Sequence, residues 1–184
     1  AAARALTRIA AGLAWLALGA CSGGERARSI LLVTLDTTRA DRLGCYGRSA
    51  AGTSVLDALA ARGARFARAY TPAPLTLPAH ASLLTGATPP YHGLRDNGIR
   101  ALDPGVETLA EVARAAGLRT AACVSGFPLD ALFGLDQGFE SYFDEFGPEH
   151  GGGGTRMQER RGDETVAAAR AWLAGLAADE GFFL

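Results

Sequence analysis

The stretch "RSILLVTLD", residues 28–36, decides how the chain is expected to fold. It is an apolar run that ends at Asp36, and such a run is typical of a central parallel strand buried on both faces. Open α/β sheets bind their ligands beyond the carboxyl ends of the strands. We therefore expect Asp36 to lie at the ligand-binding edge of a sheet.

Strands and helices are expected to alternate along the rest of the chain. Thr108 and Glu111 form a capping box that starts one helix, and Gly117 ends it. This alternation predicts an α/β fold with a mostly parallel central sheet covered by helices on both faces. The predicted helices cover residues 55–62, 78–85, 108–116 and 166–176, and the predicted strands cover 64–70, 119–125 and 181–184; a flexible break is expected at 147–155.

The first 20 residues are predicted to be an export signal rather than part of the fold. Two arginines precede an apolar stretch and a run of small residues that ends at Cys21. This ending resembles a bacterial lipobox, in which Cys21 is lipidated, so residues 21–29 would be a tether and the protein a membrane-anchored lipoprotein in the periplasm or on the outer cell surface. The alternatives are a plain secretory signal with a chance cysteine, or a buried helix.

Composition narrows the class of protein. The chain has 184 residues with 48% hydrophobic content, enough for one domain with a sizeable core. All 18 basic residues are Arg against 19 acids, and the net charge of −1 offers no basic stripe, so nucleic acid is not an expected partner. Because residue 1 is Ala and the last residues lie inside an apolar run, we expect a fragment of a longer protein.

The segment "TLPAHASLLTG", residues 76–86, carries the candidate nucleophile. Thr76 precedes Pro78, which is expected at the first position of a helix, and His80 follows one turn later. Thr76 is either a nucleophile helped by a metal or base, or an N-cap. His80 either contacts a bound anion or orders the loop, or is a partly buried structural histidine. Asp36 is either a metal ligand or the cap of its own turn, paired with Arg39.

Together these segments resemble the sulfatases of the alkaline phosphatase superfamily. "ILLVTLDTTRADRLGCYG" resembles their opening strand and metal-binding turn, and "TSVLDALAARGARFARAY" resembles the segment that follows. "TLPAHASLLTGATPPYHGLRDNG" resembles their C/S-x-P-x-R-x-x-L-x-T-G motif and the later H-G-x-x-x-N. The resemblance implies an alkaline-phosphatase-like sandwich, of which residues 30–184 would be the truncated N-terminal part of the catalytic domain.

The same resemblance implies roles for single residues. Asp36 and Thr76 would be metal ligands. Thr76 would also be the nucleophile, with the catalytic residue His80 beside it, and Asn97 would contact a non-bridging oxygen of the substrate. Nucleotide pyrophosphatase relatives use a Thr in T-F-P-N-H, and the separation 97 − 76 = 21 fits their layout. The divalent metal would be Ca²⁺ by likeness to sulfatases, or Zn²⁺ if the relatives with a Thr nucleophile are the better guide.

Three departures from the sulfatase pattern shape the predicted chemistry. Thr76 stands where sulfatases have the Cys or Ser that becomes formylglycine, His80 replaces the family Arg, and Thr37 replaces an acid. We therefore predict a hydrolase of sulfate or phosphate esters on small molecules or glycans, with phosphoesters or phosphonates as better substrates. The alternatives are an envelope phospho-group transferase with a Thr nucleophile, and an inactive lipoprotein that binds glycans. The remaining metal ligands, an Asp-His pair, are expected beyond Leu184, so the fragment alone is expected to be inactive.

Overall fold

The computed structural model describes residues 29–146 and 159–184. Its central sheet has three strands in the order β2-β1-β3: β1 is Arg119–Cys123, β2 is Ser141–Phe143 and β3 is Phe182–Phe183. Both neighbours run parallel to β1. The predicted α/β class with a parallel sheet is confirmed.

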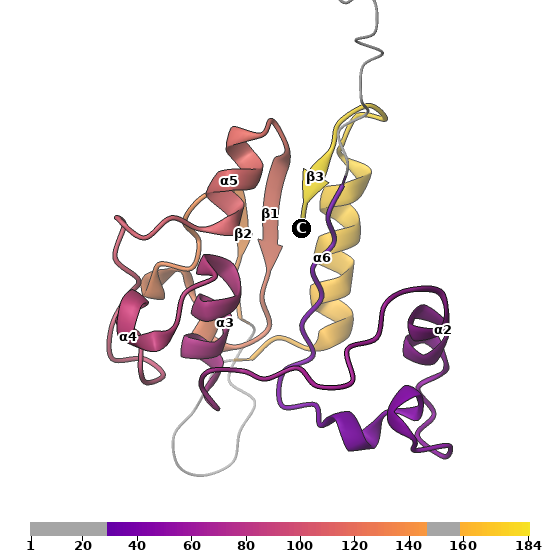
Figure 1. Cartoon of the computed structure of the whole chain (residues 1–184). Coiled ribbons are helices and arrows are strands. Elements are labelled where there is room, and N and C mark those ends of the chain that lie inside the picture. Colours follow the sequence, from indigo (N-terminus) through magenta and orange to yellow (C-terminus); the bar gives the residue numbers. More distant parts are fainter. Residues whose placement is uncertain (1–28, 147–158) are drawn as a thin grey trace, which may run out of the picture.

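Helices pack against the central strand. Helices α5 (Leu109–Ala115) and α6 (Gly162–Ala174) both contact β1 and lie on opposite sides of it in the view of Figure 1. The other α-helices are α2 (Ser54–Arg62), α3 (Thr76–Thr85) and α4 (Pro89–His92), and the short 3-10 helices are η2 (Ala40–Arg42), η3 (Gly44–Tyr46), η4 (Phe127–Leu129) and η5 (Ala131–Phe133).

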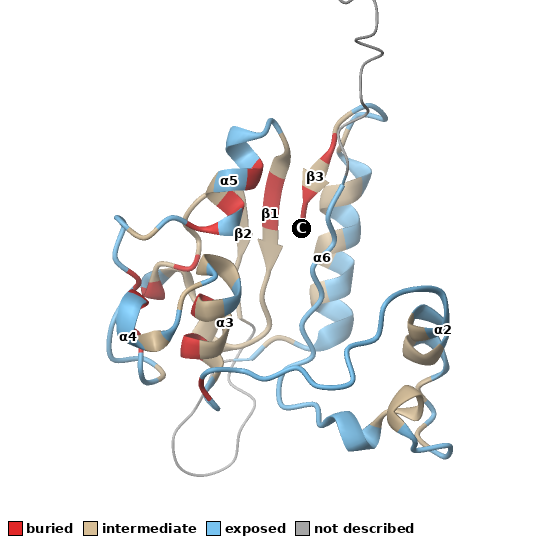
Figure 2. Cartoon of the chain, viewed as in Figure 1, coloured by how far each residue is buried: buried red, intermediate tan, exposed pale blue. Residues whose placement is uncertain are grey.

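The apolar run that leads to Asp36 is extended but is not the buried central strand that its sequence predicts. Its backbone pairs with β3 on one side, through Ile30 N–H to Phe182 O at 2.7 Å and Leu32 N–H to Leu184 O at 2.7 Å. Its backbone pairs with no other strand among the described residues, and the side chains of Leu31 and Val33 are 61% and 66% exposed (Figure 2). The run therefore forms an edge of this sheet.

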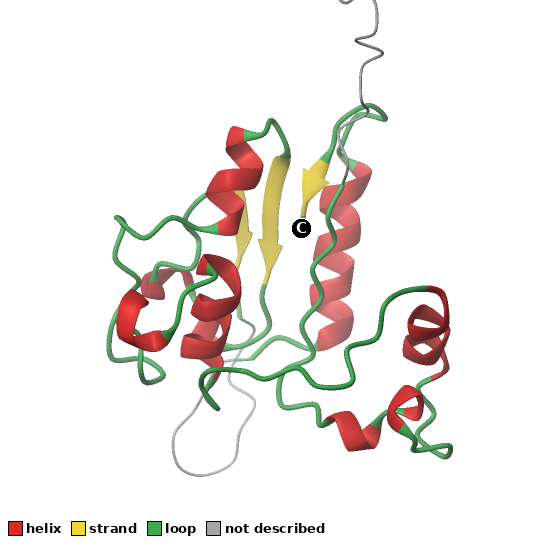
Figure 3. Cartoon of the chain, viewed as in Figure 1, coloured by secondary structure: helices red, strands yellow, loops and turns green. Residues whose placement is uncertain are grey.

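Two further expectations about local structure were wrong. Residues 64–70, expected as a strand, belong to the loop between α2 and α3 (Figure 3), where Phe66 and Tyr70 are 72% and 86% exposed. Phe66 and Tyr70 favour a strand, but the three alanines of this segment do not, and no neighbouring strand pairs with it among the described residues. Strand β2 was not predicted, because its three residues are too few to show an alternating pattern.

The capping box at the start of α5 is confirmed. Thr108 Oγ1 accepts from Glu111 N–H at 3.2 Å, and Glu111 Oε2 accepts from Thr108 N–H at 2.8 Å. The buried Thr108 hydroxyl also donates to Gln137 O at 2.9 Å, and the buried Thr120 hydroxyl donates to Gly138 O at 2.8 Å. These two hydroxyls hold the loop before β2 against α5 and β1.

Helix α3 is fixed by the larger of two apolar clusters. Its residues Leu77 and Ala81 are completely buried, and they pack in a cluster with Leu94, Leu102, Phe133 and Leu135. The second cluster joins α5 to β3 through Ala110, Ala113 and Phe183. The core therefore lies beneath the helix that carries Thr76 and His80.

Several expectations fall outside the described residues, namely the signal at 1–20, most of the tether at 21–29 with Cys21, and the flexible break at 147–155. In the part of the chain that the structure describes, no helix is both long enough and apolar enough to cross a membrane. Cys45 and Cys123 are both free thiols there.

Gly138 allows a test of the packing between the loop before β2 and α5. Its φ is +87°, and a Cβ at this position would overlap the backbone of Glu111. Gly117 has a similar φ of +84° but no atom within 4 Å of such a Cβ. Gly138→Ala should therefore lower the free energy of unfolding, measured by urea titration, by about 1–3 kcal/mol more than Gly117→Ala. Equal losses for the two variants would contradict the close approach.

Candidate active site

A hydrogen bond joins the two residues that the sequence singles out most strongly. The Thr76 hydroxyl, at the start of α3, donates to Asp36 Oδ2 at 3.0 Å although the residues are 40 positions apart. Asp36 is exposed and Thr76 is half-buried. The structure thus places a hydroxyl and a carboxylate together at the end of the apolar run.

The backbone next to Asp36 is strained. Thr37 has a φ of 55°, a left-handed conformation that costs an L-residue with a Cβ about 1–2 kcal/mol. In this conformation Thr37 N–H donates to Asp36 Oδ1 at 2.9 Å, while Oδ2 faces Thr76. The alternative pairing of Asp36 with Arg39 is not present, since Arg39 forms an ion pair with Asp41 at 2.7 Å.

Thr76 is not the N-cap of α3. The helix begins at Thr76 itself, Leu75 occupies the cap position, and Pro78 is the third residue rather than the first. Proline fits here because an amide in the first turn has no partner within the helix. The Thr76 hydroxyl therefore does not cap its own helix, and it donates to Asp36 instead.

The first-turn amides of α3 are largely occupied. Asn97 Oδ1 accepts from Leu77 N–H at 2.9 Å, Pro78 has no N–H, and Ala79 N–H donates to Leu75 O at 3.0 Å. Among the described residues, the backbone donor left for an anion at this end of α3 is therefore the N–H of Thr76. The hydrogen bond from Leu77 N–H also holds the Asn97 side chain next to the first turn of α3.

His80 connects α3 to the segment that carries Asp36. Its Nδ1 lies 2.8 Å from Thr76 O and its Nε2 lies 3.1 Å from Thr34 Oγ1. A carbonyl oxygen only accepts, so Nδ1 carries the proton, and in the neutral ring Nε2 accepts from the Thr34 hydroxyl. Both ring nitrogens are thus engaged within the protein.

Thr34 was not predicted as a site residue. Residues two apart in an extended segment face the same side, so Thr34 shares a side with Asp36. The two-residue spacing between Thr34 and Asp36 could have identified Thr34 as a site residue. It was overlooked because the surrounding residues are apolar and predict a buried strand.

His92, in the same motif as Asn97, is a structural residue. It is 3% exposed, its Nδ1 accepts from Leu94 N–H at 3.2 Å, and its Nε2 lies 2.9 Å from Ser82 Oγ. Because Nδ1 accepts, Nε2 carries the proton and donates to Ser82, so His92 cannot act as a base toward that serine. Burial lowers the pKa of His92. His150 lies outside the described residues.

Asp36 and Thr76 provide one carboxylate and one hydroxyl oxygen, the type of ligand that hard divalent cations prefer. Among residues 29–146 and 159–184, no group of three His, Cys, Asp or Glu side chains is placed to hold a metal ion. These two oxygens fit part of a metal site, and further ligands would have to come from elsewhere.

Comparison with known proteins points to one family. A family model described as Sulfatase matches residues 28–153. Arylsulfatase A from Homo sapiens is 42% identical over 79 residues, which are 43% of this chain and 16% of that protein. The chain therefore spans only a small part of this relative.

Two solved structures share the fold. A 2-O GAG sulfatase matches with a TM-score of 0.64 and 23% identity, over 85% of this chain and 34% of that one. The phosphonate monoester hydrolase of Agrobacterium radiobacter matches with a TM-score of 0.65 and 22% identity, over 85% of this chain and 40% of that one.

The buried His92 predicts a loss of stability in mild acid. Its pKa is lowered in the folded state, so below pH 6.5, the ordinary value, the unfolded chain takes up a proton more readily than the folded one. The free energy of unfolding should fall as pH drops from 7.5 toward 5.5, by at most about 1.4 kcal/mol per pH unit for one proton.

Urea titrations at several pH values measure this loss. His92→Asn, which cannot take up a proton, should remove this part of the pH dependence. The same change at the half-buried His80 is the control, and it should leave the contribution of His92 in place. An unchanged slope in His92→Asn would show that another group is responsible.

Proposed function

The chain belongs to the sulfatase family of the alkaline phosphatase superfamily, and from this membership we propose that the protein is a metal-dependent hydrolase of sulfate or phosphate esters with Thr76 as its nucleophile. The single observation that carries the proposal is the 3.0 Å hydrogen bond from Thr76 to Asp36. It puts a hydroxyl beside a group that can accept its proton, and the sequence resemblance supports the nucleophile role for this threonine.

The first chemical step is attack by Thr76 Oγ1 on phosphorus or sulfur. The Oγ1–H proton moves toward Asp36 Oδ2, a bond forms from Oγ1 to the central atom, and the bond to the leaving oxygen breaks. The leaving group departs with that electron pair and takes a proton from solvent. Water then attacks the covalent ester and releases a proton to solvent. Oγ1 leaves with the electron pair of the broken bond and takes back the proton held by Asp36 Oδ2, which restores the hydroxyl and the carboxylate.

Asp36 and Thr76 would hold the divalent cation, which would lower the pKa of the hydroxyl and offset charge on the transferred group. The strained turn at Thr37 supports this assignment, because strain in a backbone is commonly found at functional sites. The proposal requires further ligands outside the described residues.

The protein's own donors to the transferred group are few. Asn97 uses its Oδ1 to hold Leu77 N–H, which leaves the two Nδ2 protons to donate to a non-bridging oxygen. The amide of Thr76 is the second candidate donor. We assign His80 to positioning, because its two ring nitrogens bind Thr76 O and Thr34.

The preferred substrates are phosphoesters or phosphonates rather than sulfates. Thr76 carries a secondary hydroxyl, and the formylglycine of typical sulfatases is made from Cys or Ser, so the aldehyde route to sulfate release is closed here. The substrates are sulfated or phosphorylated small molecules or glycans outside the cytoplasmic membrane, where a lipid on Cys21 would anchor the protein. The proposal of export and anchoring rests on the sequence of residues 1–21 alone.

Substitution of Thr76 tests the nucleophile. In the full-length protein, Thr76→Ala should lower kcat/KM for an aryl phosphodiester by at least about a thousandfold, because the attacking oxygen is removed. Thr76→Ser keeps a hydroxyl and should retain a substantial part of the activity. Thr88→Ala makes the same change at an exposed threonine without a side-chain cap hydrogen bond, and it should leave the activity unchanged.

Parallel assays with an aryl sulfate define the substrate class. The phosphodiester should be hydrolysed faster than the sulfate, and both activities should be lost in Thr76→Ala. Full turnover by Thr76→Ala would overturn the assignment of the nucleophile, and a faster reaction with the sulfate would overturn the preference for phosphoesters.

A further inference from the structure

A cavity of about 380 Å³ lies beside the segment that carries Asn97. It is lined by Gly93, Arg95, Asp96, Ile99 and Arg100, all from one stretch of chain after α4. Its volume lies within the range of roughly 300–1,000 Å³ that is usual for small-molecule sites. Among the residues that the structure describes, one short segment supplies this lining.

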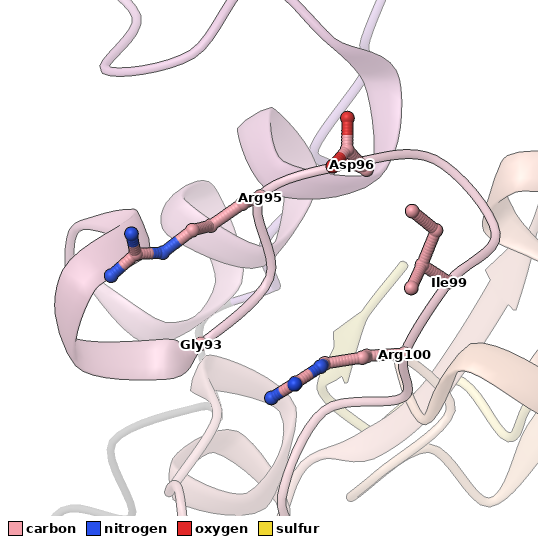
Figure 4. Close-up of a pocket in the computed structure, with 5 residues that line it drawn as sticks. All are labelled: Gly93, Arg95, Asp96, Ile99 and Arg100. Atoms are coloured by element: carbon pink, nitrogen blue, oxygen red, sulfur yellow. The ribbon is translucent and has the colours of Figure 1, made fainter.

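Two guanidinium groups dominate the charge of this cavity. Arg95 and Arg100 extend to the same side in Figure 4, with Gly93 between them, and the carboxylate of Asp96 points away from both. Neither arginine forms an ion pair with another of the described residues. The lining therefore presents two planar donor groups, each suited to a pair of oxygens of an anion.

Asn97 lies on the same loop as the residues that line the cavity. Successive Cα atoms are about 3.8 Å apart, so the Cα atom of Asn97 is within about 8 Å of that of Arg95 and about 12 Å of that of Arg100. Asn97 in turn binds the amide of Leu77, the residue after Thr76. The loop that lines the cavity is therefore tied directly to the start of α3.

From this arrangement we propose that Arg95 and Arg100 form a subsite for a second anionic group of the substrate. The inference rests on the proposed function and names its substrate class: esters that carry, besides the group transferred to Thr76, another sulfate, phosphate or carboxylate. Gly93 leaves room for the anion, and Ile99 offers an apolar surface to the part of the substrate between the two anionic groups. The subsite selects for substrates with two anions and takes no part in the chemical step.

Binding of non-hydrolysable compounds tests the subsite without any turnover. Benzene, naphthalene and biphenyl disulfonates offer a second anion at increasing distance, and benzenesulfonate is the reference with a single anion. Calorimetry on the full-length protein should show that at least one disulfonate binds about tenfold tighter than benzenesulfonate, because charge-assisted hydrogen bonds contribute more than neutral ones.

The double variant Arg95→Gln/Arg100→Gln should lose this preference. Arg170→Gln removes a charge from an exposed arginine on α6 and should keep the preference, which controls for net charge. Arg95→Lys/Arg100→Lys keeps the charge without the planar fork and should retain part of it. Equal thermal stability of the variants shows that each is folded.

Two results would overturn the subsite: no disulfonate preferred by the unsubstituted protein, or a preference that survives in the double glutamine variant. Failure of the proposed function gives a different result. In that case Thr76→Ala would hydrolyse the ester at the full rate, and the protein would still prefer disulfonates through its two arginines. The two proposals therefore fail independently.

Discussion

The hydrogen bond between the Thr76 hydroxyl and Asp36 Oδ2 is the contact on which the site depends. Its two partners are held by different parts of the molecule. Asp36 follows a segment paired with β3, and Thr76 begins a helix whose next residue, Leu77, is completely buried. A shift of either support would separate the hydroxyl from its acceptor, so the apolar cluster beneath α3 also maintains the chemistry.

Most of the polar groups around this contact are already used by the protein. His80 ties Thr76 O to Thr34, and Asn97 holds the amide of Leu77. These bonds fix the geometry, and they also remove donors that an anion would otherwise use. The donors left for a substrate in our proposals are the Asn97 side-chain nitrogen, the backbone amide of Thr76 and, on either side of Asn97 in its loop, Arg95 and Arg100.

The sequence predicted the features that depend on local pattern. The α/β class, the capping box at Thr108 and strand β1 were readable because periodicity and capping are local signals. The features that were missed depend on neighbours: residues 64–70 lack a strand to pair with, and the Leu77 amide meets Asn97 only after folding. Thr76 and Asp36 could be nominated from the sequence, but their contact could not.

The central claim is that Thr76 is covalently modified during turnover. The most direct measurement is mass spectrometry of the full-length protein, acid-quenched within milliseconds of mixing with an aryl phosphodiester and then digested. The account predicts a phosphoryl adduct on the peptide that contains Thr76, absent from Thr76→Ala. An adduct on a peptide that lacks Thr76, or rapid turnover without any adduct, would contradict it.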